Sequence, residues 1–172
     1  MIAKFLPVGA ALLLLASPAL ASAAPTDPQI AHIAYTAGNI DIAAAKQALV
    51  RSKTPEVREF AELMIRDHKA VNDKALALLN KLHVKPEANA TSAALSKQAE
   101  ATERKLGHLS GSAFDRAYIQ NEVAFHQTVN GALEKTLIPN AHNAELKSLL
   151  ETGLTLFREH QDHAQQLGQQ LK

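Results

Sequence analysis

The chain of 172 residues has no cysteine and no tryptophan, and only 4% of its residues are aromatic. Without cysteine it forms no disulfide and carries no lipid on a thiol, and it offers no thiolate to a metal ion or to covalent catalysis. Any metal site in this protein must therefore use nitrogen and oxygen ligands.

Neither sign of charge is in excess, with 18 basic and 17 acidic residues. Residues 1–23 contain one basic residue, Lys4, and no acid, so residues 24–172 hold 18 − 1 = 17 basic and 17 acidic residues. A nucleic-acid or membrane-surface partner would require a basic stripe, and the sequence has none. The sequence also contains no nucleophile–base arrangement and no phosphate-binding glycine loop. Among enzymatic activities, only a metal-dependent oxidoreductase is left open.

The one long apolar run stands at the start of the chain. Lys4 precedes an apolar stretch over residues 5–20, and small residues follow it. This order indicates a secretory signal peptide over residues 1–23. Cleavage after Ala21 or after Ala23 fits the preference for small residues at the cleavage site. We therefore expect a periplasmic or secreted protein.

A transmembrane anchor is the alternative interpretation of this segment. Pro7 and Pro18 interrupt it, and it falls short of the roughly 20 strongly apolar residues that a spanning helix needs. Residues 24–172 form a chain long enough to bury one proper core, so a single domain is expected there.

Apolar residues recur at spacings of three and four along the rest of the chain, and no segment alternates as a strand would. The pattern predicts four long helices, over residues 28–52, 55–82, 112–137 and 143–171, and a short helix over 92–106.

Breakers mark the ends of these helices. Asp27-Pro28 and Thr54-Pro55 each supply an N-cap followed by a first-turn proline. Ser112, with Asp115 three residues later, predicts a capping-box start for the third long helix, and Pro139 is expected to end it.

The connections predict the topology. Two links, near residues 53 and 139, are short and force antiparallel neighbours, whereas residues 83–111 can cross the bundle from end to end. We therefore predict an all-α, antiparallel four-helix bundle of the ferritin-like kind, with a short helix in the long connection between the second and third long helices. A plain up-down bundle with a decorated loop is the alternative.

Apolar residues spaced by three and four form a stripe along one face of each predicted helix. Five polar residues lie on these otherwise apolar stripes: Asp41, His68, Glu122, His126 and His160. Glu122 and His126 are one turn apart, so both project from one face of their helix. Imidazoles and carboxylates from facing helices are ligands for iron, manganese, zinc or copper. The five residues are therefore candidate ligands of a transition metal ion whose identity the sequence leaves open.

The predicted positions of these residues along the bundle axis agree for the first helical hairpin and disagree for the second. At about 1.5 Å per residue, Asp41 lies roughly 18 Å before the first turn and His68 roughly 21 Å after it. His126 lies roughly 18 Å before Pro139, whereas His160 lies about 26 to 31 Å beyond it. His160 therefore reaches the same level only if residues 140–145 wind irregularly.

Ligating imidazoles need an outer hydrogen-bond acceptor, and Asp67, Glu159 and Asn72 are available for that role. His163, one turn after His160, either joins the site or occupies a solvent-exposed position at the edge of the helix face. Tyr35 and Tyr118 are expected to pack at the edge of the core.

A metal-free protein is the second hypothesis. The bundle would then bind a partner or support the cell envelope under stress, and its inward polar groups would satisfy one another. Direct contacts below about 3.2 Å between the imidazoles and the carboxylates would favour this hypothesis. Formation of a homodimer is left open.

Several stretches of the chain match a recognisable pattern: Ala37–Asp41, Val57–Ala61, Met64–His68, Leu109–Tyr118 with His126, and Leu156–His160. Together they span about residues 28–167 and resemble the exported bacterial proteins grouped as domain of unknown function 4142, in the ferritin-like superfamily. The resemblance implies a ferritin-like bundle but no activity, because the family is defined by having none assigned.

The chain departs from the di-iron members of that superfamily. Those proteins typically carry Glu-x-x-His on two helices and a glutamate on each of the others, and this sequence contains no Glu-x-x-His. Asp41 is also shorter than the glutamate usually found on the first helix. A ferroxidase or oxygen-activating di-iron centre therefore has little support.

Overall fold

The computed structural model describes residues 24–171, so the signal peptide predicted over residues 1–23 lies outside them. The described chain contains helices and no strand: α1 (Asp27–Arg51), α2 (Pro55–Lys81), α3 (Ala90–Gly107), α4 (Gly111–Ala132), α5 (Ile138–Asn140) and α6 (Ala144–Gln170). A π-helical turn, Leu133–Leu137, continues α4 into α5. Over the same range, no helix combines the length and the hydropathy needed to cross a membrane.

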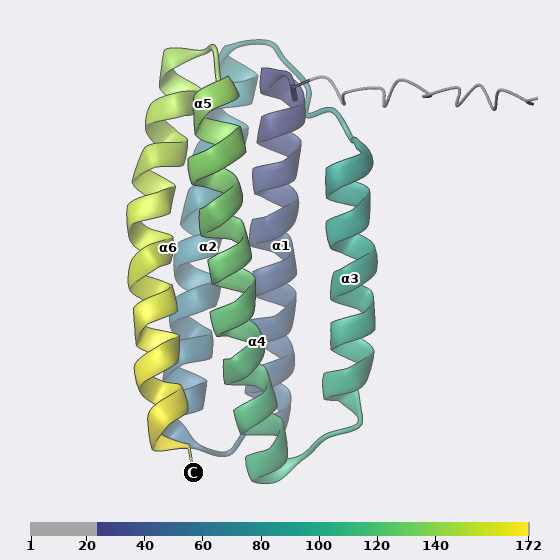
Figure 1. Ribbon diagram of the computed structural model, residues 1–172, viewed down its shortest axis with the longest axis vertical. Helices are drawn as coiled ribbons and strands as arrows, with labels where there is room; N and C mark the ends of the chain where they lie inside the picture. Colours follow the sequence, from purple (N-terminus) through teal and green to yellow (C-terminus); the bar gives the residue numbers. More distant parts are fainter. Residues whose placement is uncertain (1–23, 172) are drawn as a thin grey trace, which may run out of the picture.

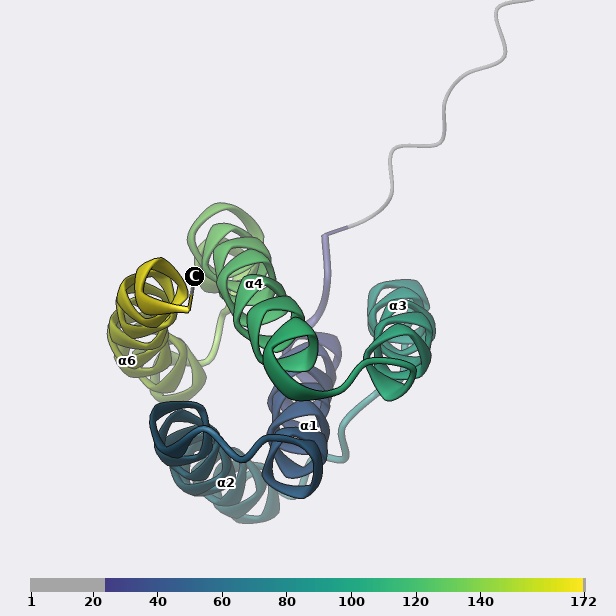
Figure 2. The same ribbon diagram turned by 90° about the horizontal axis from the view of Figure 1, so that it is seen from below.

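Four helices, α1, α2, α4 and α6, form the bundle, and α3 lies outside it, against α1 (Figures 1 and 2). α1 and α2 are antiparallel, as are α4 and α6, whereas α2 and α4 run in the same direction (Figure 1). The connection between α2 and α4 returns along the length of the bundle through α3. This is the predicted ferritin-like topology, and the plain up-down alternative is wrong.

The predicted helix starts are close to the observed ones but use different residues. Thr26, not Asp27, is the N-cap of α1, and it forms a capping box with Gln29. α4 begins at Gly111 rather than Ser112. Asp115 does not complete a capping box there, because its Oδ2 accepts a hydrogen bond from Oγ1 of Thr54 at 2.6 Å. This contact joins the start of α4 to the start of α2.

Pro139 does not end the third long helix. The π turn places the N–H of Ile138 on the carbonyl of Leu133, five residues earlier, and Pro139 then sits in the first turn of α5. A proline is tolerated in a first helical turn, where its missing N–H leaves no bond unmade. The helix therefore continues to Asn140, three residues beyond the predicted end at 137.

Two apolar clusters fill the two ends of the bundle. Near the α1–α2 turn, an aromatic cluster is built around Phe60, Phe114 and Tyr118. At the opposite end, an aliphatic cluster is built around Ile30, Leu133, Leu137, Leu146 and Leu150. The five predicted site residues lie between these two clusters.

Candidate metal centre

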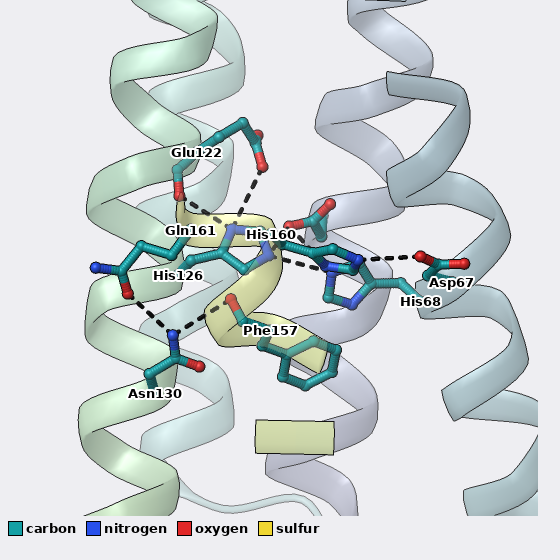
Figure 3. Close-up of polar contacts among 9 residues, drawn as sticks. Asp67, His68, Glu122, His126, Asn130, Phe157, His160 and Gln161 are labelled. Atoms are coloured by element: carbon teal, nitrogen blue, oxygen red, sulfur yellow. Dashed lines mark hydrogen bonds and ion pairs between the residues drawn. The ribbon is translucent and has the colours of Figure 1, made fainter. Parts of the chain in front are cut away.

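The five predicted site residues are all buried in the middle of the bundle. Their exposed fractions are 1% for Asp41, 3% for His68, 1% for Glu122, 1% for His126 and 2% for His160. Each of the four bundle helices contributes at least one of them. Figure 3 shows His68, His126 and His160 turned toward one another.

His160 reaches the level of His126 because the second hairpin turns later than the sequence predicts. α5 ends at Asn140, fourteen residues after His126, and α6 begins at Ala144, sixteen residues before His160. The ring centroids of His126 and His160 are 5.5 Å apart. The non-helical residues 141–143 between α5 and α6 lie within the range 140–145 for which irregular winding was predicted, whereas the π turn Leu133–Leu137 lies outside it.

Three candidate ligand atoms form a nearly regular triangle. Nε2 of His68 lies 3.4 Å from Nε2 of His126. Oδ2 of Asp41 lies 3.5 Å from the first nitrogen and 3.6 Å from the second. Ligand atoms bound at about 2.1 Å around a tetrahedral ion are about 3.4 Å apart. The triangle therefore has the dimensions of one face of a tetrahedral metal site.

Hydrogen bonds orient two of the three imidazoles for coordination. Nδ1 of His126 donates to the carbonyl oxygen of Glu122 at 3.0 Å, which leaves its Nε2 lone pair in the triangle. Nε2 of His160 donates to Oδ2 of Asp67 at 3.1 Å, which leaves Nδ1 as the ligand atom. An outer acceptor of this kind fixes the tautomer of metal-bound histidines.

One ligand atom from each of His68, His126 and His160 lies within 4.8 Å of the others. Asp41, Glu122 and His126 form a second such group, so the two groups overlap at His126. Two ligands on opposite sides of one ion are about 4.2 Å apart at bond lengths of about 2.1 Å. Small side-chain movements would therefore bring either group onto one ion.

The two carboxyl groups form a buried pair that holds protons. Burial raises the pKa of Asp41 to about 7, although the neighbouring carboxyl group of Glu122 acts in the opposite direction. Burial and the neighbouring charge of Asp41 raise the pKa of Glu122 well above its usual range. Without a cation, the pair therefore keeps at least one carboxyl proton near neutral pH.

The imidazoles are neutral for the same reason. Burial lowers the pKa of His126 to about 4 and lowers the pKa of His68 well below its usual value. Burial also lowers the pKa of His160, against the opposing effect of Asp67. Neutral imidazoles with free lone pairs are the state that binds metal ions.

Buried polar atoms without a hydrogen-bond partner gather at this level of the described chain. They are both carboxylate oxygens of Asp41, Oε2 of Glu122, Nδ1 of His68 and Nδ1 of His160. Buried polar groups in folded proteins are usually paired, so these atoms are free to bind a ligand or to share a carboxyl proton. The metal-free hypothesis expects contacts below about 3.2 Å. His160 meets this criterion, because its Nε2 lies 3.1 Å from Oδ2 of Asp67. The distances from His68 and His126 to Asp41, and from His126 to Glu122, are longer, at 3.5 to 3.7 Å.

The other predicted roles have mixed outcomes. Asp67 is the outer acceptor for His160, as expected, whereas Glu159 is exposed. Asn72 is buried but donates to Oδ1 of Asn39 at 3.1 Å instead of bonding a site histidine. His163 does not join the cluster, because it is exposed and packs edge-on against Phe60.

Tyr118 does not lie at the edge of the core, as predicted. It is fully buried, and burial together with the charges of Glu122 and Asp41 raises its pKa well above the usual value. Tyr35 is half-buried, in agreement with an edge position.

Asn130 is a buried polar residue near the site that the sequence analysis missed. Its Nδ2 donates to Oε1 of Gln161 at 2.9 Å and to the carbonyl oxygen of Phe157 at 3.4 Å (Figure 3). It thereby ties α4 to α6 beside His160. Asn130 stands one turn after His126 on the same stripe, so that spacing was the signal available in the sequence.

The fold and the buried imidazole–carboxylate cluster define a ferritin-like four-helix bundle protein. More particularly, the chain belongs to the family described as Domain of unknown function (DUF4142), whose model matches residues 14–167. None of the curated proteins matches the chain.

Two solved structures share the fold at low sequence identity. One is a DUF305 protein from Streptomyces coelicolor, inferred to be secreted. It has 13% identity and a TM-score of 0.68, and the match covers 82% of this chain and 90% of that one. The other is CopM in its Cu(II)-bound form. It has 17% identity and a TM-score of 0.63, and the match covers 84% of this chain and 98% of that one.

Proposed function

We propose that this protein binds one transition metal ion in the middle of its bundle. Asp41, His68 and His126 provide the triangle of ligand atoms, and His160 provides a fourth through Nδ1. Glu122, beside Asp41 and His126, provides a fifth ligand or holds the Asp41 carboxylate in place. The triangle of 3.4 to 3.6 Å sides is the observation that carries the proposal.

The charges of the site support a divalent ion. Two ionised carboxylates balance two positive charges, so the loaded site adds no net charge to the interior, where an unbalanced charge is costly. Three imidazole nitrogens suit zinc and copper more closely than the harder ions, which prefer sites rich in oxygen. Copper is also the ion in the structure of CopM, which has the same fold. Zn(II) and Cu(II) are therefore the first ions to test.

We also propose that the protein acts outside the cytoplasm. The signal-peptide pattern of residues 1–23 supports this location, and the fold is shared with a protein inferred to be secreted. Cell fractionation and N-terminal sequencing test it. The expected result is a protein in the periplasm or the medium that begins at Ser22 or Ala24, and a cytoplasmic protein that retains Met1 would contradict it.

Metal analysis tests the main proposal. Protein purified from its native compartment is expected to hold, or to take up from Zn(II) or Cu(II), about one ion per chain. The double variant His68→Ala/His160→Ala should lose this ion. A matched double variant, His32→Ala/His163→Ala, removes two histidines outside the cluster and should keep it. Equal metal content in all three proteins, or none in the wild type at saturating Zn(II) and Cu(II), would contradict the proposal.

A further inference from the structure

A cavity of about 800 Å³ lies in the half of the bundle that holds the aliphatic cluster. Buried residues of several elements line it, among them Ile33, Ala37, Ala75, Leu133 and Leu150. None of the described residues that line it is charged. The cavity is therefore an apolar space enclosed by several helices of the bundle.

The residues that face this space explain why it is open. Ala34, Ala37, Ala75 and Ala132 all line it, and each has a side chain of one carbon. The opposite half of the bundle is filled by the three buried rings of the aromatic cluster. In the aliphatic cluster, Phe157 is the one aromatic residue among the described members. Small side chains without large partners across the bundle leave space in this half.

Polar residues without charge occur at the exposed parts of the lining. Thr26 and Thr136 are exposed, and Gln29, Asn89 and Asn140 are half-buried. Hydroxyl and amide groups can exchange hydrogen bonds with a neutral polar group at the mouth of the cavity. They cannot balance a charged ligand group.

We propose that this cavity binds an uncharged, mainly apolar small molecule. Ligand sites in proteins typically enclose about 300 to 1,000 Å³ and combine apolar walls with a few polar groups. A charged molecule is disfavoured, because no lining residue offers it an opposite charge and transfer of an unpaired ion from water is costly. This site is separate from the proposed metal centre.

Phe157 is the boundary between the two sites. It lines the cavity and stacks on His68 with ring centroids 4.6 Å apart. A molecule in the cavity would therefore contact Phe157. Binding there needs no metal ion, so the two proposals can fail independently.

The neutral dye N-phenyl-1-naphthylamine tests the proposal, using metal-free protein that begins at residue 24. We expect a saturable rise in dye fluorescence at one dye per chain. The variant Ala132→Leu, which fills the cavity from a half-buried position on α4, should weaken binding by about tenfold or more, equivalent to about 1.4 kcal/mol. Ala75→Leu fills the cavity from α2 and should act in the same way.

Ala117→Leu is the matched control. Ala117 is also half-buried on α4, but it packs against the aromatic cluster and should leave dye binding unchanged. Circular dichroism shows which variants fold, and Ala132→Leu decides the test if Ala75→Leu does not fold. Absence of saturable binding, or equal binding by folded Ala132→Leu and Ala117→Leu, would overturn the proposal.

Discussion

Nε2 of His160 on α6 lies 3.1 Å from Oδ2 of Asp67 on α2, closer than any of the distances from His68 or His126 to Asp41 or Glu122. Asp67 also accepts a hydrogen bond from Nε of Arg66 at 2.8 Å. Burial acts to raise the pKa of Asp67, but the hydrogen bonds from Arg66 and His160 outweigh it and lower the pKa. Asp67 is therefore ionised at neutral pH and holds the proton of His160 on Nε2.

The first prediction concerns this outer carboxylate. Asp67→Asn removes the charge that fixes the tautomer of His160, so we expect metal affinity to fall by about 10- to 100-fold, as for comparable outer-ligand changes. Competition with a chelator of known affinity measures the change. Asp73→Asn is the control, because Asp73 is an exposed residue on the same helix that pairs with Lys69. Equal affinities in the two variants would show that Asp67 does not position His160 for binding.

The second prediction is that metal binding tightens as pH rises toward 7. The metal ion must displace the protons held by the carboxyl pair, and the pKa of Asp41 is about 7. For displacement of the Asp41 proton alone, affinity at pH 5 should be about 50-fold lower than at pH 7, and displacement of a second proton from Glu122, whose pKa is also raised, would steepen this dependence. His126, with a pKa of about 4, is already neutral over this range and contributes no such dependence.

Chelator competition at pH 5, 6, 7 and 8 measures this dependence. Calorimetry in buffers of different ionisation enthalpy counts the released protons. The prediction fails if affinity is constant between pH 5 and 7, or if binding near pH 6 releases no proton.

The third prediction is that the buried Asp41 carboxylate lowers the free energy of unfolding of the metal-free protein at neutral pH. The pKa of Asp41 is about 3.8 in the unfolded chain and about 7 in the fold, so between these pH values the folded chain holds a proton that the unfolded chain has released. The contribution of Asp41 to stability is therefore complete below about pH 4 and is lost as pH rises through 7. Asp41→Asn has no such loss, so its stability relative to the wild type should increase with pH over this window.

Urea unfolding of metal-free protein at pH 5 and pH 8 measures the effect. At pH 8 we expect Asp41→Asn to raise the free energy of unfolding by roughly 1 to 3 kcal/mol, as for other removals of a poorly compensated buried charge. The same variant should bind metal more weakly, because it loses a ligand oxygen of the triangle. A variant whose advantage over the wild type is no larger at pH 8 than at pH 5 would contradict this account of Asp41.

The sequence predicted the helices and the inward position of the five candidate ligands because both depend on one periodic signal. A polar residue such as His68, at a position where the stripe is otherwise apolar, must point inward once the helix packs. On α4, Glu122 and His126 are more deeply buried than the apolar residues beside them, since Phe125 and Val129 are only half-buried. The apolar stripe therefore predicted which face of the helix points inward, but it did not predict which residues of that face are the most deeply buried.

Features that depend on backbone geometry or on distant contacts were not predictable from that signal. The π turn before Pro139 is a local change of hydrogen bonding that the spacing of apolar residues does not encode, and the helix continues through it past Pro139. Asp115 and Asp27 are acidic residues near helix starts, where a sequence pattern predicts capping. Both carboxylates instead accept hydrogen bonds from residues far away in the sequence. The full burial of Tyr118 depends on how four helices meet, which no single stripe specifies.

The last prediction separates stability from function at one end of the bundle. Asp27, in the first turn of α1, accepts hydrogen bonds from the backbone N–H groups of His142 and Asn143, each at 2.8 Å. These contacts hold the link between α5 and α6 against the start of α1. Hydrogen bonds to a charged acceptor contribute more than neutral ones, and a carboxylate is favourable in a first helical turn.

Asp27→Ala should therefore lower the free energy of unfolding by about 1 to 3 kcal/mol in urea titrations. Asp162→Ala, which removes an exposed carboxylate from α6, should change it by no more than about 0.5 kcal/mol. Metal affinity should be the same in both folded variants, because the site lies in the middle of the bundle and is held by α1, α2, α4 and α6 together. If Asp27→Ala instead weakened metal binding while leaving stability unchanged, the link between α5 and α6 would control the depth of His160, and the bundle would not hold the site rigidly.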